Sequence, residues 1–254
     1  MLEYKIQGQG PALFLLHGFL EDGSIWEPLV AELRHTYRCI QIDFPGYGSH
    51  RRAEFPERLE PLAAALEDLR QDLFLDEFSI MGHSMGVYIG LSWLDLSEIK
   101  PRAFVGVNGS VYPDSPERLL ERKRSLSLVS RHKDAYIKMA LKGLFLPEQL
   151  RLYTREIEDL TTRALQCPSA ALMRSIQAMS TRKNHKKTLS AFNGEKYIIA
   201  GDKDPLFPIS FIRDMARETG ADLYTYSGSH MGWLEAPELI LRVLGSERIP
   251  SASD

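Results

Sequence analysis

The chain has 254 residues, which is enough for one large α/β domain or two small ones. Hydrophobic residues make up 44% and charged residues 26%, and the net charge of −3 argues against a general nucleic-acid-binding protein. The first ten residues lack the pattern of a signal peptide, and the apolar run 11–20 is too short to span a bilayer. Cys39 and Cys167 are expected to be buried hydrophobic residues rather than a disulfide. These features indicate a soluble, cytoplasmic enzyme or binding domain.

Strand-like and helical patterns alternate along most of the chain. A weak edge strand, "EYKIQ", is expected at the N-terminal end, and stronger strand patterns follow at 12–18, 37–43, 78–82, 103–109, 196–202 and 223–228. Helical patterns occupy about 24–34, 59–75, 85–96, 209–219 and 234–244. This alternation predicts an α/β fold, a doubly wound and mostly parallel sheet of about seven strands with helices on both faces.

The alternation stops between residues 113 and 190, where the sequence is helical and strongly basic. This segment has 16 Lys or Arg against 8 Asp or Glu, a net charge of +8, so the remainder carries −11. Because so long a segment is not an ordinary loop, residues 113–190 are predicted to form a helical lid. The lid would divide the core into residues 1–112 and 191–245, with a flexible tail at 246–254.

The stretch "FSIMGHSMGVYIG", residues 78–90, places a serine between two glycines where a strand pattern gives way to a helix. A reactive serine must stand clear of the sheet, so the chain has to turn sharply and Ser84 adopts a strained positive φ. Neighbouring turns then leave room only for glycine at positions 82 and 86. The alternative is a capping serine at the start of an ordinary helix. The strand–turn–helix context favours a nucleophile.

A serine nucleophile needs a base, and His230 is the best placed of the seven histidines. It follows the last predicted strand, in a turn before the final helix, so its loop would reach the carboxyl edge of the sheet. His83 adjoins the serine, but its side chain should point away from the hydroxyl in a structural role. The remaining histidines apart from His17 lie in polar contexts and are expected to be solvated: His35, His50, His132 and His185.

The carboxylate that orients the base is predicted to be Asp204, in "KYIIAGDKDPLFP". Asp202 is the rival and is more typical of a turn-forming residue. Asp43 also follows a strand, but we expect it to accept hydrogen bonds from loop amides. The chain order is therefore serine, acid, histidine, as in α/β-hydrolases and unlike chymotrypsin or subtilisin.

Acyl transfer to a serine builds an oxyanion that needs two waiting donors. The N–H of Met85 lies at the start of a helix, where amides are unpaired and the helix dipole favours an anion. The second donor is expected to be the N–H of Phe19, in a loop that turns at Gly18. His17 is expected to support this loop by hydrogen bonding.

The sequence resembles the α/β-hydrolase superfamily, in particular its single-domain esterases. The motifs occur in the family's order and span nearly all of the chain outside 113–190: "LLHGF" (15–19), "DFPGYGSH" (43–50), "GHSMG" (82–86), "GDKDPLFP" (201–208) and "GSHMGWLEAPE" (228–238). The resemblance implies an α/β-hydrolase fold with a Ser84–Asp204–His230 triad, an oxyanion hole from Phe19 and Met85, and a helical lid. Since the chain before residue 12 is short, the first of the family's usual eight strands is expected to be missing.

Members of this family catalyse many different reactions, and particular residues of this chain exclude some of them. Serine at position 84 excludes relatives that use a carboxylate nucleophile, such as dehalogenases. No His/Cys/Asp spacing indicates a metal site, and no G-x-G-x-x-G follows a strand, so no metal, nicotinamide or flavin cofactor is expected. Hydrolysis of a carboxylic ester or thioester remains as the leading hypothesis. A carbon–carbon-bond hydrolase and a ligand-binding protein on the same fold remain as alternatives.

The basic charge of residues 113–190 gives an indication of the substrate. The Lys and Arg excess would attract an anionic partner, for example an acyl group on an acidic carrier protein or on coenzyme A, although a solvated helical surface is the simpler explanation. The sequence leaves acyl length and oligomeric state open. Apolar residues predicted to wall an acyl pocket are Phe19, Trp26, Met139, Leu144, Phe145, Leu146 and Trp233.

Overall fold

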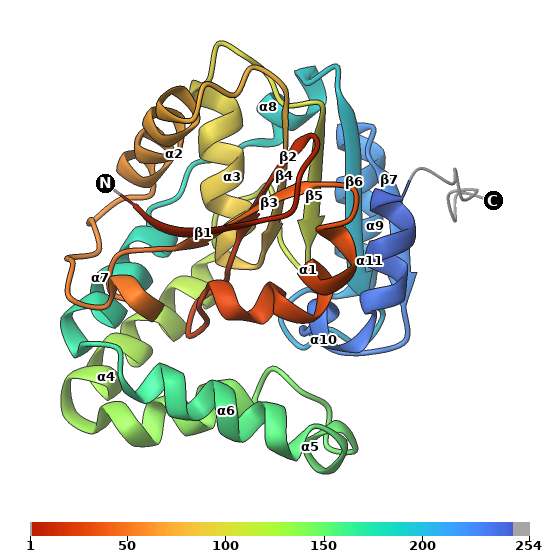
Figure 1. Cartoon of the computed structure of the whole chain (residues 1–254). Coiled ribbons are helices and arrows are strands. Elements are labelled where there is room, and N and C mark those ends of the chain that lie inside the picture. Colours follow the sequence, from red (N-terminus) through yellow and green to blue (C-terminus); the bar gives the residue numbers. More distant parts are fainter. Residues whose placement is uncertain (1, 246–254) are drawn as a thin grey trace.

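A computed structural model describes residues 2–245, which form an α/β sandwich around one twisted sheet (Figure 1). Within these residues the sheet has seven strands in the order β1-β3-β2-β4-β5-β6-β7. Only β1 is antiparallel to its neighbour, so the predicted fold class is confirmed. The strands are β1 (Glu3–Gln7), β2 (Ala12–Leu16), β3 (Arg38–Asp43), β4 (Phe78–His83), β5 (Ala103–Val107), β6 (Glu195–Gly201) and β7 (Asp222–Tyr226).

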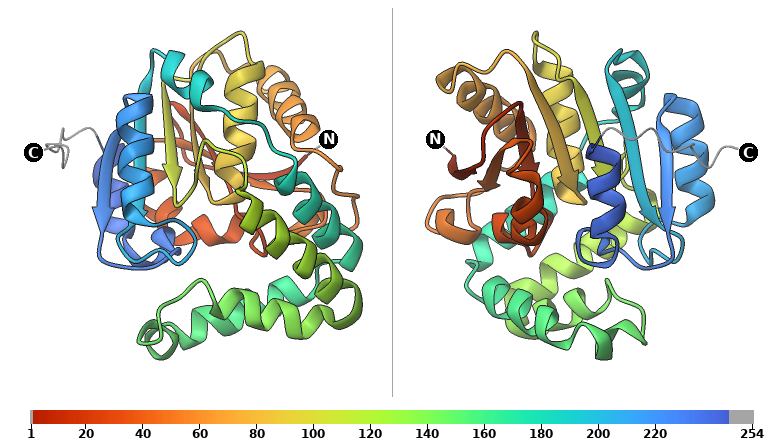
Figure 2. Two further views of the ribbon diagram at one scale, coloured as in Figure 1. Left: turned by 180° about the vertical axis from the view of Figure 1, so that it is seen from behind. Right: turned by 45° about the vertical axis from the view of Figure 1, so that its right-hand side comes forward.

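Helices cover both faces of this sheet (Figures 1 and 2). On one face α1 (Glu27–Leu33) packs against α11 (Pro237–Leu244). On the other face lie α2 (Glu60–Asp72), α3 (Met85–Leu96), α8 (Lys186–Ala191) and α9 (Ile209–Thr219). Short elements complete the core: the 3₁₀ turns η1 (Gly23–Trp26) and η2 (Gly48–His50), and α10 (Gly232–Glu235). None of the helices within residues 2–245 is both long and apolar enough to cross a membrane.

The structure contains every predicted strand, but four end earlier than the sequence pattern, β6 by one residue and three others by two. The patterns at 12–18, 103–109 and 223–228 each extend two residues beyond the end of β2, β5 and β7. Those extra residues leave the sheet at its carboxyl edge, where they build loops instead of pairing. The predicted helix 234–244 divides into α10 and α11 because Ala236, which precedes a proline, has a non-helical φ of −137°.

The predicted lid region is helical in the structure. It contains α4 (Pro116–Lys142), α5 (Gln149–Leu152), α6 (Thr154–Leu165) and α7 (Ser169–Ser180), followed by α8. Helix α4 bends at His132 and packs against both α6 and α7. Figure 2 shows this helical insertion below the carboxyl ends of the parallel strands. The predicted tail at 246–254 lies outside the described residues.

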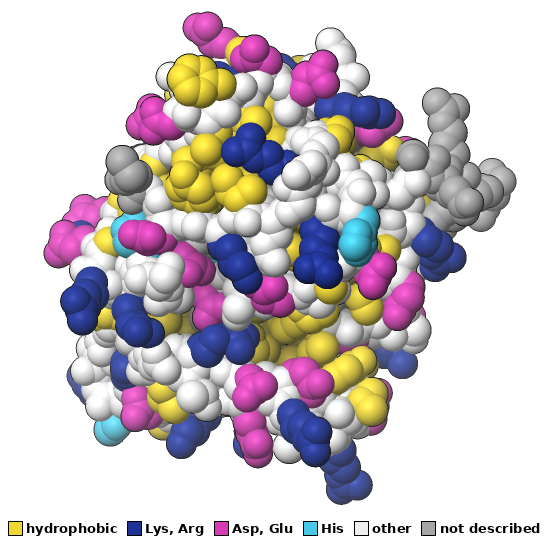
Figure 3. All heavy atoms as spheres, viewed as in Figure 1, with side chains coloured by type: hydrophobic (Ala, Val, Ile, Leu, Met, Phe, Trp, Pro, Cys, Tyr) yellow, Lys and Arg dark blue, Asp and Glu magenta, His cyan; other side chains and the backbone are white. Residues whose placement is uncertain are grey.

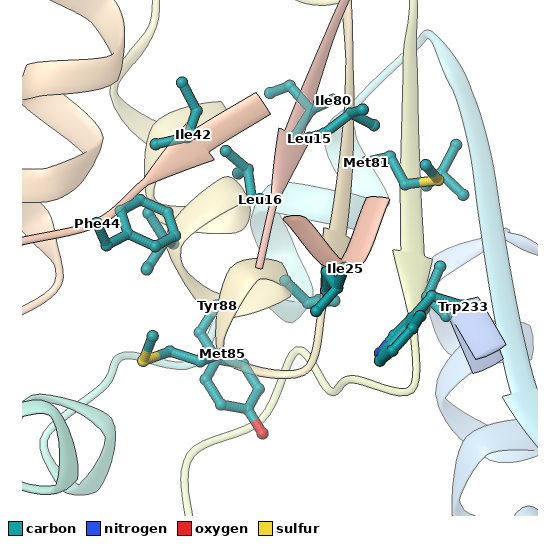
Figure 4. Packing of buried hydrophobic residues seen from close by; sticks show 14 of the residues in the cluster. Leu15, Leu16, Ile25, Ile42, Phe44, Ile80, Met81, Met85, Tyr88 and Trp233 are labelled. Atoms are coloured by element: carbon teal, nitrogen blue, oxygen red, sulfur yellow. The ribbon is translucent and has the colours of Figure 1, made fainter. Parts of the chain in front are cut away.

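The centre of the sheet determines where a site can form. Strand β2 pairs with β3 on one side and β4 on the other, so the strand order reverses there. In open α/β sheets, ligands bind beyond the carboxyl ends of strands at such a reversal. All five β2 residues are buried, and Figure 4 shows Leu15 and Leu16 packed beside Ile80 and Met81. A rigid apolar core therefore supports the loops that follow β2 and β4.

Candidate active site

Ser84 occupies a strained turn between β4 and α3. Its backbone has φ 50° and ψ −110°, a conformation that a non-glycine residue rarely adopts. A Cβ at Gly82 would lie 2.5 Å from the carbonyl carbon of Gly86, and a Cβ at Gly86 would lie 2.2 Å from the Leu16 oxygen. The two glycines are therefore required because the turn is so tight.

His230 lies between β7 and α10 and faces Ser84 directly. Its Nε2 is 2.9 Å from Ser84 Oγ, and its Nδ1 is 2.8 Å from Asp204 Oδ2. Its backbone N–H donates to the carbonyl of Leu144 in the helical insertion. The ring is almost completely buried, so its orientation is fixed on both sides. Three segments that are far apart in the sequence thus form one hydrogen-bonded chain.

Asp204 is held as a buried anion. Its Oδ1 accepts from the N–H of Leu206 at 2.8 Å, and its Oδ2 accepts from Asn108 Nδ2 at 3.0 Å. Burial alone would raise its pKa, but the charge of His230 and these hydrogen bonds lower the pKa below its ordinary value of 3.8. The rival Asp202 instead accepts from the N–H of Gly228. Asp204 is therefore the carboxylate that contacts the histidine.

Of the two residues predicted to supply oxyanion donors, Met85 follows Ser84 directly and Phe19 lines the same cavity as Ser84. Met85 is the first residue of α3, so its N–H has no intrahelical acceptor. Among the hydrogen bonds of residues 2–245, none uses the N–H of Phe19 as donor. His17 supports the Phe19 loop: its Nε2 accepts from Phe44 N–H, so Nδ1 carries the proton and donates to the Gly18 carbonyl at 2.8 Å.

Two other predictions about polar side chains agree with the geometry. Asp43 accepts from the N–H groups of Gly23 and Ser49, both at 2.7 Å, so it stabilises loops. Cys39 and Cys167 are buried free thiols, and burial raises the pKa of Cys39 to about 11 and that of Cys167 to about 12. Both thiols are consequently poor nucleophiles.

The prediction that His185 is solvated is wrong. Its side chain is buried beside α3, where Nε2 lies 3.2 Å from Ser92 Oγ, because α8, which begins at the next residue, packs against α3. His35 and His132 are exposed as expected, and His50 is half-buried.

A cavity of about 280 Å³ opens beside Ser84 and His230, between the core and the helical insertion. Tyr88, which Figure 4 shows on α3, contributes to its wall. The other lining residues are Phe19, Leu20, Glu21, His83, Arg118, Glu121, Arg122, Ser125, Tyr136, Met139, Ala140, Gly143, Leu144, Met179 and Leu206. Hydrophobic side chains also gather on the surface where the core meets the insertion (Figure 3).

The lining corrects part of the predicted pocket. Phe19, Met139 and Leu144 line this cavity, but Trp26, Phe145, Leu146 and Trp233 are absent from its wall. Trp26 is fully buried in the core, and Trp233 turns its indole N–H toward Glu21. Phe145 packs near Tyr153. Apolar character in the sequence cannot distinguish a core residue from a cavity residue, since both exclude water.

Sequence reasoning missed the side chains that support the triad. Asn108 follows β5 with φ 48° and donates to both Asp204 and the Ser229 carbonyl. Its Oδ1 accepts from Tyr226 OH at 3.0 Å. Glu235 holds the histidine loop from the other side, accepting from the Ser229 N–H at 2.8 Å. The sequence feature that could have identified Asn108 is its position, since it is a polar residue directly after a central strand.

The fold and this site define the class of protein. The profile of the Alpha/beta hydrolase family matches residues 13–243, so the chain belongs to that family and is an enzyme of the hydrolase type. Solved structures agree in fold: an esterase from Thermogutta terrifontis has a TM-score of 0.87 at 22% identity, covering 96% of this chain and 91% of that one. An enol-lactonase from Burkholderia xenovorans LB400 has a TM-score of 0.86 at 18% identity, covering 96% and 95%.

Curated relatives have higher sequence identity than these solved structures but overlap less of the chain. A pimeloyl-[acyl-carrier protein] methyl ester esterase of Vibrio vulnificus is 38% identical over 72 residues, and the match spans only 28% of this chain and 25% of that protein. An enzyme of the same description from Xanthomonas campestris is 26% identical over 212 residues, or 82% of each chain. The magnesium-chelatase 30 kDa subunit of Rhodobacter capsulatus is 34% identical over 132 residues, covering 48% and 46%.

Proposed function

We propose that this chain is a serine hydrolase that cleaves a carboxylic ester or thioester through an acyl-enzyme. The observation that carries the proposal is the hydrogen-bonded series Ser84–His230–Asp204 beside a cavity. A nucleophile, a base and an orienting carboxylate in this geometry support acyl transfer. Family membership and esterase relatives point to the same reaction class.

In the proposed first half-reaction, Ser84 Oγ attacks the carbonyl carbon while its proton passes to His230 Nε2. The carbonyl oxygen becomes an oxyanion, which the N–H groups of Phe19 and Met85 stabilise. Collapse of this intermediate breaks the bond to the leaving alcohol or thiol, which takes the proton from His230. Asp204 keeps the imidazole in the required tautomer and stabilises its charged form.

In the second half-reaction, His230 removes a proton from water and the hydroxide attacks the acyl-enzyme. The second oxyanion collapses, the carboxylic acid departs, and the proton on His230 returns to Ser84 Oγ. Water is the only co-reactant, and the free enzyme is regenerated.

We also propose that the acyl group is presented on an anionic carrier. Two observations support this finer proposal: the helical insertion carries a net charge of +8, and the relatives in Vibrio and Xanthomonas act on a carrier-protein-linked methyl ester. A basic surface raises the encounter rate with an acidic partner. The cavity of about 280 Å³ is small, which favours a short or medium acyl chain.

The decisive experiment compares wild type with Ser84→Ala on p-nitrophenyl esters and acyl thioesters of graded chain length. We expect kcat to fall on the order of 10⁵–10⁶-fold in the variant, because a triad acts as a unit. A fluorophosphonate probe should label wild type stoichiometrically at Ser84 and leave the variant unlabelled. Full turnover by Ser84→Ala would disprove the proposal, and an inert wild-type serine would indicate a binding protein instead.

A further inference from the structure

A buried carboxylate, Glu21, lies beside the candidate site without a part in the proposed chemistry. Its side chain is about 1% exposed. Oε2 accepts from the Gly18 N–H at 2.7 Å and lies 2.8 Å from His83 Nδ1, while Oε1 accepts from Trp233 Nε1 at 3.1 Å. All three neighbours are donors from separate chain segments, so one carboxylate ties those segments together.

His83 extends this connection to the catalytic histidine loop. Its Nε2 lies 2.8 Å from the backbone carbonyl oxygen of His230. Because a carbonyl oxygen can only accept, Nε2 must carry a proton, and the Glu21 carboxylate accepts from Nδ1. The ring is therefore the charged partner of a buried ion pair.

The pKa values of the pair agree with this assignment. Burial would raise the pKa of Glu21, but His83 and the Gly18 N–H lower it below 4.5. Burial would lower the pKa of His83, but Glu21 raises it above 6.5. Breaking one partner of such a pair leaves an uncompensated buried charge.

The loop that Glu21 anchors is strained. Leu20, between Phe19 and Glu21, has a positive φ of 65°. A left-handed conformation is unfavourable for a leucine, so the loop would relax if nothing held its end. Relaxation would rotate the peptide bonds around Phe19, and with them the N–H that is aimed at the oxyanion.

We propose that Glu21 and His83 are positioning residues, a buried pair that sets the Phe19 loop, the Ser84 turn and the His230 loop at fixed distances from one another. Both residues border the cavity, but their polar side-chain atoms bond to one another and to Gly18, Trp233 and the His230 backbone, and the pair acts through those groups. The inference rests on the proposed function, because it assigns the pair a role in forming the oxyanion hole.

The test is Glu21→Gln, which keeps the shape but turns an amide NH₂ toward one of the three N–H donors. We expect kcat on a p-nitrophenyl ester to fall about 100-fold, with KM changed by less than about threefold, because a misplaced donor acts only in the transition state. Inhibition by a trifluoromethyl ketone, which forms an oxyanion adduct, should weaken by the same factor. Inhibition by the product carboxylate should stay unchanged.

Glu67→Gln is the matched control. Glu67 also accepts from a tryptophan Nε1, that of Trp93 at 2.8 Å. This contact is near the C-terminal end of α3, whereas Ser84 precedes the N-terminal end. This variant should lower the Tm while kcat stays within about twofold of wild type, because it removes a partly buried, hydrogen-bonded charge remote from the site. If Glu21→Gln fails to fold, Trp233→Phe removes one donor from Glu21 and keeps an aromatic ring, and it should lower kcat several-fold with little change in KM.

Hydrogen–deuterium exchange of residues 17–22 provides a readout that needs no substrate. Exchange should be faster in Glu21→Gln than in Glu67→Gln, since only the former releases the loop. If wild-type Ser84 reacts normally and Glu21→Gln matches Glu67→Gln in both kcat and exchange, the positioning role is wrong. If wild-type Ser84 is itself unreactive, the proposed function fails, and the exchange comparison alone decides whether the pair holds the loop.

Discussion

At the scale of single residues, backbone strain gathers at the candidate site. Four non-glycine residues within 2–245 have a positive φ, and three of them border the site: Leu20, Ser84 and Asn108. Such conformations persist only where surrounding contacts determine them fully. Here those contacts are the two glycines of the turn, the Glu21 network and the hydrogen bonds of Asn108.

Asp202 and Asp204, which both follow β6, allow the proposed role of Asp204 to be tested by a pair of matched variants. Asp204→Asn should lower kcat about 10³–10⁴-fold, because an amide NH₂ facing His230 Nδ1 favours the wrong imidazole tautomer. Asp202→Asn retains an oxygen that can accept from the Gly228 N–H, so kcat should change by less than about threefold. Steady-state kinetics on one p-nitrophenyl ester measures both. Equal losses would mean that Asp202 shares the role of orienting the base.

At the scale of elements, α3 begins directly after Ser84, the proposed nucleophile, and packs against α2. Ten residues of α3 are buried, from Met85 at the turn to Leu94, so the helix is fixed on nearly all sides. A helix start buried in this way keeps its free amides in place for an anion. Glu67 on α2 joins the two helices at the other end of α3, where it accepts from Trp93 and Ser97 as well as from Arg70 on α2.

The Glu67 contacts predict a pH-dependent stability. Burial would raise the pKa of Glu67, but its hydrogen bonds lower it to about 2. The group therefore contributes stability fully above its ordinary value of 4.5 and loses it as the pH falls toward 2. Glu67→Gln should lower the free energy of unfolding by about 2 kcal/mol at neutral pH. Urea unfolding at pH 7 and pH 3 should give a smaller difference at the lower pH; a constant difference would contradict an ionised Glu67.

At the scale of the whole molecule, charge and contacts link the helical insertion to the site. The insertion carries +8 and the remainder −11. Asp114 at its base pairs with both Arg122 and Arg182, and Leu144 accepts from the N–H of His230. The insertion is thus attached to the His230 loop by a backbone hydrogen bond, and ion pairs stabilise its base.

This charge distribution predicts a salt effect that depends on the substrate. If an acidic carrier presents the acyl group, kcat/KM should fall about tenfold between about 50 and 500 mM NaCl, because screening weakens steering. A neutral p-nitrophenyl ester of the same acyl group should show little change. Identical salt profiles for the two substrates would remove the case for an anionic carrier.

The sequence by itself determined the fold class and the serine turn. Alternating apolar patterns specify a parallel sheet with helices on both faces, and two glycines around Ser84 reflect a local steric constraint. Chain order and strand ends also pointed to Asp204 and His230, since parallel strands end at one edge. These properties follow from the steric needs of short segments and from the spacing of hydrophobic residues along the chain.

Only the tertiary structure decided which side chains support and surround the site. Glu21 and His83 are 62 residues apart, and His83 reaches the His230 carbonyl across 147 residues. Such contacts depend on strand register and on where each loop leaves the sheet, which no local pattern records. The same reason separates Trp26 in the core from Met139 at the cavity, although both are apolar residues in the sequence.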